Sequence, residues 1–471
     1  MVPLRRLSSL LLLIASACAG ALAISSEQSE RLDRDFQTAV AQYNSGRLAD
    51  AAIRLEALLQ DVPESFEVHE LLGLVYSAQS QDLKATTHFE KAVKLRPNSA
   101  AARTNYAANL ARRGRLDLAE KEFRSAVELD SENFDANHDL GELYVRSGKI
   151  SQAEPFLQQA HRVNPSSYDN GYNLALVYVQ MGRLSDARDL VNDLLTRKNT
   201  SELHNLLGVV EEKDEKFVAA ANEFETAAHL DPSESNLFDW GSELLLHRTL
   251  DPAIEVFRQA AQRYPGSPRV AIGLGVALYS RGNYDDAVKS LLRAADLNPS
   301  DPDCYRFLSR AYDSSPSQAE EVIRRFRRFA ELQSKNPAAL YYYAMTLWKG
   351  RRMQDAGLDL HQIQSLLREA IRLDPSFAEA HLQLGNLYSD QKQYADAISE
   401  YVIAVKYSPD LGDLHYRLGQ AYVRTGDKDR AQKEFELYQR LRAEHLAEAD
   451  KQKADIRQFV YTARDSPAPK Q

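Results

Sequence analysis

A short pattern of leucine, glycine, aromatic and alanine residues returns about every 34 residues along most of this 471-residue chain. A period of this length means that one small supersecondary unit is copied, and such a unit cannot bury its apolar face without a neighbouring copy. We therefore expect stacked units that share a continuous core. The pattern starts at Leu72-Gly73, Leu140-Gly141, Leu174-Ala175, Leu207-Gly208, Leu274-Gly275, Leu384-Gly385 and Leu418-Gly419.

The spacing within each unit predicts two helices. Leu72 and Tyr76 lie one turn apart on a first helix, and Phe89 and Ala92 lie in the same way on a second. A glycine such as Gly73 marks a place where two helix axes must approach closely, because a larger side chain would hold them apart. A proline ends the second helix by removing a backbone donor. These prolines are Pro97, Pro165, Pro232, Pro265, Pro299, Pro375 and Pro409.

This series resembles the signature of the tetratricopeptide repeat family, in which LGxxY lies on the first helix and alanine, aromatic, alanine and proline follow on the second. The resemblance implies an all-α fold, a right-handed superhelical α-solenoid of about twelve helix-turn-helix repeats over residues 32–445. The repeats are expected at residues 32–65, 66–99, 100–133, 134–167, 168–200, 201–233, 234–267, 268–301, 302–336, 337–376, 378–411 and 412–445.

The ninth and tenth repeats are irregular over residues 313–360. The stretch Asp313–Pro316 is expected to break one first helix early, and residues 349–360 insert about seven residues between the next two helices. The insertion is either a tolerated loop or a joint or partner contact supported by the aromatic cluster Tyr341, Tyr342, Tyr343 and Trp348.

A charged segment follows the last repeat. It carries apolar residues such as Leu441, Leu446, Ile456 and Phe459, so residues 446–464 are predicted to form a capping helix that covers the final repeat. The tail at 465–471 is expected to be disordered.

The first residues resemble an export signal. Arg5 and Arg6 precede the apolar run 7–17, and Ala21-Leu22-Ala23 is a small-residue cleavage site, so residues 1–23 are predicted to be a signal peptide. Alternatively, the sequence ending at Cys18 resembles a lipoprotein signal in which this cysteine is lipidated and supplies the only membrane attachment. Both interpretations predict an exported protein of the periplasm or cell envelope, as an outer-membrane lipoprotein or a secreted protein.

The composition and the missing motifs of the chain limit the classes of function that it can have. The net charge of -9 argues against nucleic-acid binding, which requires phosphate neutralisation. After removal of the signal only Cys304 remains, which excludes an intramolecular disulfide and a thiolate metal site. No phosphate loop, GxSxG or HExxH motif is present, so we expect neither catalysis nor a cofactor. The regularly placed His69, His204, His381 and His415 are interpreted as structural, and no metal is expected.

The resemblance implies that the first helices line a groove that binds a peptide or partner protein. Asn105, Asp139 and Asn173 stand one period apart and should form a row, and an asparagine can both donate to and accept from a peptide backbone. His138 and Asp139, with Glu142, do not suit the family's basic clamp for a terminal carboxylate. The neighbouring groove candidates are Thr104, His138, Tyr172, Asn205, Phe238, Asn109, Arg112 and Arg146.

Two function classes follow. The first is an exported, non-catalytic scaffold or adaptor that binds a peptide or partner protein in its concave groove. The alternative is a structural subunit of a cell-envelope machine for polysaccharide export, secretion or assembly. The sequence names neither the partner nor the oligomeric state.

Overall fold

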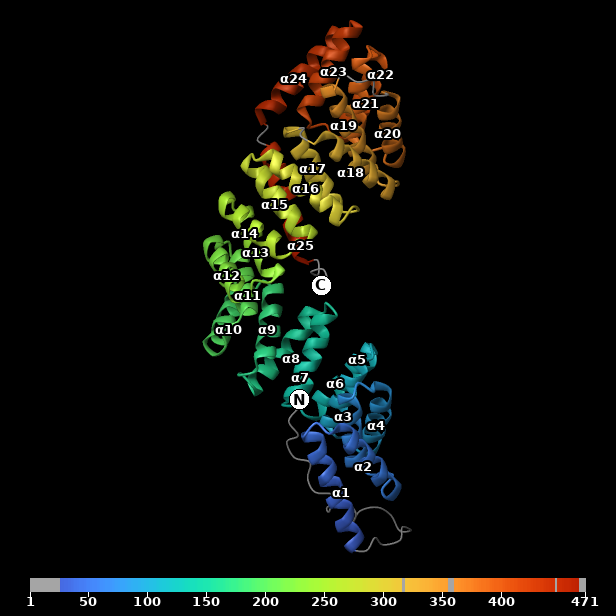
Figure 1. The fold of residues 1–471 in the computed structure, drawn as a ribbon, viewed down its shortest axis with the longest axis vertical. Helices are drawn as coiled ribbons and strands as arrows, with labels where there is room; N and C mark the ends of the chain where they lie inside the picture. Colours follow the sequence, from blue (N-terminus) through green and yellow to red (C-terminus); the bar gives the residue numbers. More distant parts are fainter. Residues whose placement is uncertain (1–25, 316–317, 355–359, 445–446, 466–471) are drawn as a thin grey trace. The chain divides into compact units, whose positions relative to one another are not determined.

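The computed structural model describes residues 26–315, 318–354, 360–444 and 447–465, and every regular element in these ranges is an α-helix (Figure 1). The prediction of an all-α solenoid of tetratricopeptide-type helix pairs is confirmed. The predicted signal peptide at 1–23, its Cys18 and nearly all of the 465–471 tail lie outside the described residues.

The chain divides into two compact units, residues 1–199 and 200–471, each built from helix pairs. Unit 1 contains α1(Ser26–Asn44), α2(Leu48–Asp61), α3(Phe66–Ala78), α4(Asp82–Leu95), α5(Ala100–Arg112), α6(Leu116–Leu129), α7(Phe134–Arg146), α8(Ile150–Val163), α9(Tyr168–Gln180) and α10(Leu184–Arg197).

Unit 2 continues the same alternation and ends with an additional helix. It contains α11(Ser201–Lys213), α12(Phe217–Leu230), α13(Glu234–Leu246), α14(Leu250–Arg263), α15(Pro268–Arg281), α16(Tyr284–Leu297), α17(Pro302–Ser314), α18(Ala319–Leu332), α19(Pro337–Gln354), α20(Leu360–Leu373), α21(Ala378–Asp390), α22(Tyr394–Tyr407), α23(Gly412–Thr425), α24(Lys428–Glu444) and α25(Ala447–Asp465).

Each helix pair begins and turns in the same way. The first helix usually starts at a side-chain cap: Ser65, for example, accepts from the backbone N–H of Val68, and Asn133 accepts from that of Ala136. The turn to the second helix contains a residue in the left-handed region, which favours glycine, as at Gly182 with φ 75°.

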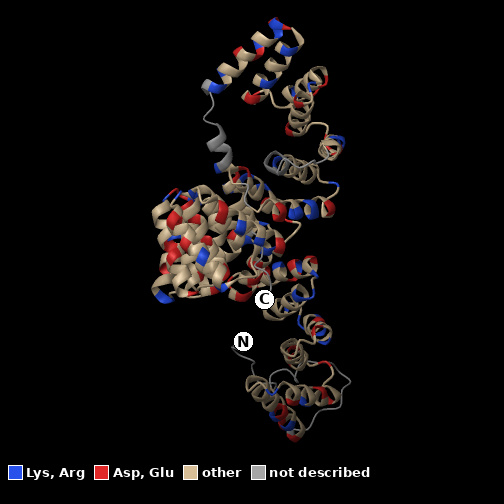
Figure 2. Ribbon diagram, turned by 45° about the horizontal axis from the view of Figure 1, so that its top comes forward, with Lys and Arg blue, Asp and Glu red and all other residues tan. Residues whose placement is uncertain are grey.

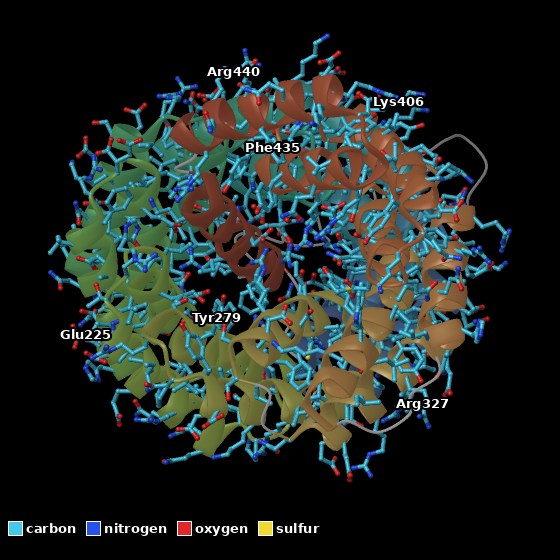
Figure 3. The ribbon with its side chains drawn as sticks, turned by 90° about the horizontal axis from the view of Figure 1, so that it is seen from above. Glu225, Tyr279, Arg327, Lys406, Phe435 and Arg440 are labelled. Atoms are coloured by element: carbon cyan, nitrogen blue, oxygen red, sulfur yellow. The ribbon has the colours of Figure 1, made fainter. Side chains whose placement is uncertain are left out.

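The odd-numbered first helices form the inner layer of each unit. Successive first helices pack on one another, as α3 does on α5 and α15 does on α17, whereas among the second helices of the described residues only α16 and α18 do so to a similar extent. Helices crowd together on the inside of a curve, so the first helices mark the concave side. In unit 2, Glu225 of α12 and Lys406 of α22 point outward, while Tyr279 of α15 lies on the inner rim (Figure 3).

A spacing of 16 residues between a glycine and a large side chain recurs along the chain, and it explains why these helix pairs resemble one another. A Cβ on Gly141 would lie 2.5 Å from Leu157 Cγ, and one on Gly73 would lie 2.5 Å from the Phe89 ring. Gly385 has the same relation to Tyr401, at 2.6 Å. These first helices therefore need a glycine there, because the side chain of the second helix lies directly against the backbone; the corresponding residues in α5 and α9 are the buried Ala107 and Ala175.

The recurring histidines tie the two helices of a pair to the turn before them. His381 Nδ1 lies 2.6 Å from Glu400 Oε2 on the second helix, and its Nε2 lies 3.2 Å from the Pro375 carbonyl oxygen. His415 repeats both contacts with Glu434 and Pro409. Arg103 uses the same place to bind Glu122 and the Pro97 carbonyl. Both ring nitrogens of His381 and of His415 thus have partners within the fold, which agrees with a structural role for these two histidines.

The irregular region differs from its predicted course. The early break in the ninth repeat is wrong: α17 continues to Ser314 and has 13 residues, as α13 does. The insertion lengthens the next first helix, because α19 extends to Gln354 and has 18 residues; residues 355–359 lie outside the described ranges. Tyr343 and Trp348 of α19 are buried in the core.

The C-terminal helix exists, but its place is not that of a cap over the final repeat. Instead α25 packs on α13 and α15, far earlier in unit 2, and it lies on the inner side of these helices (Figure 3, dark red). The reason is its apolar face, on which Ile456, Phe459, Val460 and Ala463 are all buried. This face finds an apolar partner on the concave side of unit 2.

We predict that Gly141→Ala destabilises unit 1 by about 1 to 3 kcal/mol, because the new methyl group overlaps Leu157 and the core must shift. Chemical denaturation followed by circular dichroism would measure the loss. The matched control is Gly412→Ala, where the nearest atom to the added Cβ lies 3.7 Å away; it should leave stability unchanged or raise it. Equal stability of Gly141→Ala and the parent would contradict the assigned contact.

Candidate functional site: the inner faces of the two units

In unit 1 the predicted row of groove residues lies on successive first helices. Asn105 of α5, Asp139 of α7 and Asn173 of α9 are each half-buried. Asn105 is held in place because its Nδ2 donates to Glu70 Oε1 at 2.5 Å. Asn105 thus contacts a polar side chain of the preceding first helix, α3.

Glu70 of α3 is a polar residue of this face that the sequence analysis missed. It stands one period before Thr104, and this regular spacing was the signal that could have found it. Burial raises the pKa of Glu70 to about 7, against the opposing effects of the Asn105 hydrogen bond and the Arg96 charge. Its Oε2 is buried and receives no hydrogen bond from the described residues. Ionisation of the Glu70 carboxyl group in the folded protein is therefore unfavourable at neutral pH.

Asn109 is removed from the groove candidates, because its side chain is fully buried. It accepts from Thr86 at 2.6 Å and donates to Asp82 at 3.1 Å, so it joins α5 to α4. Arg112 and Arg146 remain exposed at the ends of their helices. Arg112 pairs with Asp82 at 3.0 Å.

One turn of α7 gathers three polar side chains. In the described part of the chain, His138, Asp139 and Glu142 are the one group whose possible ligand atoms lie within 4.8 Å of one another. His138 Nδ1 lies 3.2 Å from Asn170 Oδ1, and burial raises the pKa of Asp139 to about 6, with the His138 charge opposing. The structure offers no second observation that points to a cation, so we treat these groups as groove surface.

Tyr172 continues this surface onto α9. Its ring stacks on Tyr168 with a centroid separation of 6.4 Å, and it is half-buried. With Asn173 of the same helix and Asp139 of the adjacent α7, it supplies an aromatic ring, an amide and a carboxyl group to the inner layer. These groups can pack on and hydrogen-bond an extended peptide.

The inner face of unit 2 differs because α25 occupies it. Arg464, near the end of α25, meets three carboxylates. Its Nη1 donates to Glu212 Oε2 at 2.6 Å, its Nε lies 3.4 Å from Asp239 Oδ1, and its Nη2 lies 3.7 Å from Glu243 Oε2. We call Glu212, Asp239 and Glu243 the acidic socket.

The acidic socket is buried and carries an excess of negative charge. The Glu243 side chain is 0% exposed and that of Arg464 is 13% exposed. Burial, and next the charge of Glu212, raise the pKa of Glu243 to about 7. Burial alone would lower the pKa of Arg464, but the three carboxylates outweigh it and raise that pKa.

Two further contacts fix α25. The Phe459 ring packs edge-on against Phe238 and Phe307, with centroid separations of 6.1 and 5.7 Å. At the other end, Asp455 accepts from Arg306 at 3.2 Å and also from Arg310. Along α25, the Asp455 carboxylate, the Phe459 ring and the Arg464 guanidinium thus make the contacts, in that order.

The predicted residues of this unit support the socket and the apolar contact. Asn205 Nδ2 donates to Asp239 Oδ2 at 2.8 Å, and Phe238 is fully buried beneath α25. The sequence analysis did not single out Glu243 or Asp239, which are buried. Their position within the apolar first helix α13 was the available signal.

The described helices include none that is both long enough and apolar enough to cross a membrane. Lys and Arg are interspersed with Asp and Glu along the helices of both units (Figure 2), in keeping with the modest net charge of -9.

Paired helices of similar length, a small residue against a larger partner in most pairs and a shared inner layer define a helical repeat protein. Models described as tetratricopeptide repeat or TPR repeat match residues 83–134, 110–162, 145–209, 244–311, 366–399, 385–426 and 412–445. The chain belongs to the tetratricopeptide repeat family, and it is a protein-interaction scaffold by fold.

Its curated relatives are distant. BBSome complex member BBS4 of Bos taurus is 24% identical over 248 residues, which is 52% of this chain and 46% of the relative. TPR repeat-containing protein YpiA of Bacillus subtilis (strain 168) is 25% identical over 187 residues, 40% of this chain and 42% of YpiA. The chain thus spans less than half the length of these relatives.

Among solved structures, YrrB, described as a TPR protein with an unusual peptide-binding site, is similar with a TM-score of 0.34 and 22% identity. The match covers 41% of this chain and 97% of YrrB.

We predict that Glu70→Gln stabilises unit 1 at pH 8 by roughly 1 to 3 kcal/mol and has little effect near pH 4.5. The folded pKa of about 7 lies above the usual 4.5, so between these values the folded state holds a proton that the unfolded state has lost. Stability from this group is therefore present at low pH and is lost as pH rises through 7. The glutamine keeps the oxygen that accepts from Asn105.

Urea denaturation at several pH values would measure this difference. The exposed Glu128 provides the matched control, and Glu128→Gln should show no such pH dependence. A Glu70→Gln variant whose stability differs from the parent by the same amount at every pH would contradict the buried, protonated carboxyl.

Proposed function

We propose that this protein is an exported, non-catalytic scaffold that holds an extended peptide of a partner protein against the inner face of unit 1. The observation that carries the proposal is the set of partly exposed polar and aromatic side chains, Asp139, Tyr172 and Asn173, on the adjacent inner helices α7 and α9. Each of these side chains is half-buried, so each is positioned by the fold and still presents atoms to solvent.

The chemistry of this surface suits a peptide backbone. The amide of Asn173 both donates and accepts, the Asp139 carboxyl accepts, and the Tyr172 ring offers an apolar face. Unit 2 supports the same use of the inner layer, because its first helices hold the polypeptide segment α25 by side chains of comparable kind.

The place of action is part of the proposal. The predicted export signal at residues 1–23 supports the periplasm or cell envelope. A stable complex there would make the protein a subunit of an envelope assembly, whereas transient capture would make it an adaptor. BBS4, a relative, is by name a member of a complex.

We predict that Asp139→Ala, Tyr172→Ala and Asn173→Ala combined weaken partner binding at least tenfold, which corresponds to about 1.4 kcal/mol, while the helical content is retained. Crosslinking and pull-down from the native envelope with the full-length chain would measure the recovered partner.

The matched control places three alanines on the outer layer of unit 1, at the exposed Lys121, Glu128 and Asn192. This variant should recover the partner as the parent does. Unchanged recovery by the inner-face variant, with a melting temperature equal to that of the control, would reject the groove as the binding surface.

A further inference from the structure

We propose that the inner face of unit 2 is a receptor site for an amphipathic helix of a partner protein, and that α25 occupies this site as an internal competitor. The ligand helix carries an acid, an aromatic residue four positions later and an arginine five positions after that, as Asp455, Phe459 and Arg464 do. This goes beyond the peptide groove of unit 1, because it concerns a different surface and a helical ligand.

The position of α25 is the first argument. It is not part of a helix pair, and it packs on helices that precede it by many repeats. Arg464 binds Glu212, which lies 252 residues away in sequence, and Asp455 binds Arg310, which lies 145 residues away. The same amphipathic helix could reach these contacts from another chain, because none depends on sequence continuity with unit 2.

The acidic socket is the second argument. Three carboxyl groups surround a single guanidinium, so the acids of the socket outnumber the arginine that α25 supplies. Neither oxygen of Glu243 receives a hydrogen bond from the described residues, although the side chain is completely buried. The nearest nitrogen atoms, His247 Nε2 at 3.2 Å and Arg464 Nη2 at 3.7 Å, lie close to Glu243 without hydrogen-bond geometry. Burial lowers the pKa of His247, which disfavours a charge on that ring. A ligand whose arginine reaches deeper gains bonds that α25 leaves unmade.

The apolar contact is the third argument, and it specifies an aromatic ligand. Phe238 and Phe307 are 0% and 1% exposed with α25 in place, and Phe459 is the ring they share. Departure of α25 would open both rings to water, which is unfavourable. The face therefore exchanges one aromatic helix for another and does not stay empty.

The chain also has the means to exchange α25. Its outer side is solvated at Ala454 and Arg457. The partly exposed Gln458 and Tyr461 still reach Arg306 and Glu212, at 3.4 and 3.1 Å. The sequence from Lys428 to Asp465 contains no glycine or proline, so helix-breaking residues do not impose the change of direction between α24 and α25. Tethering gives α25 an effective concentration on the order of 1 mM, which a ligand must overcome.

The test uses the full-length chain and a fluorescent synthetic peptide with the sequence of residues 447–465. Fluorescence polarisation should show weak binding to the parent chain, because its own α25 competes. The double variant Phe459→Ala and Arg464→Ala frees the site, and it should bind the peptide at least tenfold more tightly. A peptide carrying the same two alanines should not bind.

The matched control chain is Arg457→Ala, which removes an arginine from the exposed side of α25 and should bind the peptide as weakly as the parent. Should the double variant unfold, Asp455→Arg provides a second release of α25, through repulsion from Arg306 and Arg310. Both released chains binding no more tightly than the parent would overturn the proposal.

A second copy of this chain is the competing occupant. Analytical ultracentrifugation of the parent chain should show a monomer at the concentrations used for binding. A dimer that the 447–465 peptide dissociates would assign the site to α25 of another copy, and would overturn the claim of a separate partner. The unit 1 variants described above leave this experiment unchanged, so the two proposals fail independently.

Discussion

The close approach of two helices at a single glycine is the constraint on which the rest of this structure depends. At Gly141 the Leu157 side chain lies against the first helix where a Cβ would be only 2.5 Å away. The same contact recurs at Gly208 with Phe224 and at Gly275 with Leu291. Because it sets the separation of the two helices, each pair is nearly a copy of the last, and pairs of equal shape can stack with a continuous core.

Stacking then determines where polar chemistry can be placed. The first helices pack on one another along the inner layer, so a residue at one repeat position forms a row with its counterparts. At the repeat position that His381 and His415 occupy, the side chain links the first helix to the second, as His381 does by contacting Glu400. One position further along the helix it brings Glu70, Thr104, His138 and Tyr172 into the inner layer of unit 1. Of these four, Glu70 and the sequence-predicted groove candidate Thr104 are buried, whereas His138 and Tyr172 remain partly exposed.

The two units use that layer differently. In unit 1 it remains polar and half-exposed, with Asp139 and Asn173 on adjacent helices. In unit 2 it contains Phe238 and the carboxyl groups of Asp239 and Glu243, and the amphipathic helix α25 covers them with its apolar face and with Arg464. The inner layers of the two units therefore differ in how far their polar groups are removed from water. A buried carboxylate cluster is unfavourable without a cation, and Arg464 supplies that cation.

Much of the candidate site could be anticipated from periodicity, and the misses share one cause. Asn105, Asp139 and Asn173 were found because they repeat with the helices that carry them. Asn109 was wrongly included, since its burial depends on Thr86 and Asp82 of the preceding helix. The acidic socket was missed, because an acid within a helix has the same sequence signature whether its neighbour is water or Arg464.

The sequence by itself determined the family, the helix pairs and the inner layer, because these follow from local spacing and from side-chain volume at positions such as Gly73 and Phe89. Tertiary structure alone decided where α25 packs. Its apolar face would have suited a cap on the last repeat equally well, and hydrophobicity is not directional. The choice was made by charge and shape at distant residues, with Arg464 against the acidic socket and Phe459 against Phe238 and Phe307.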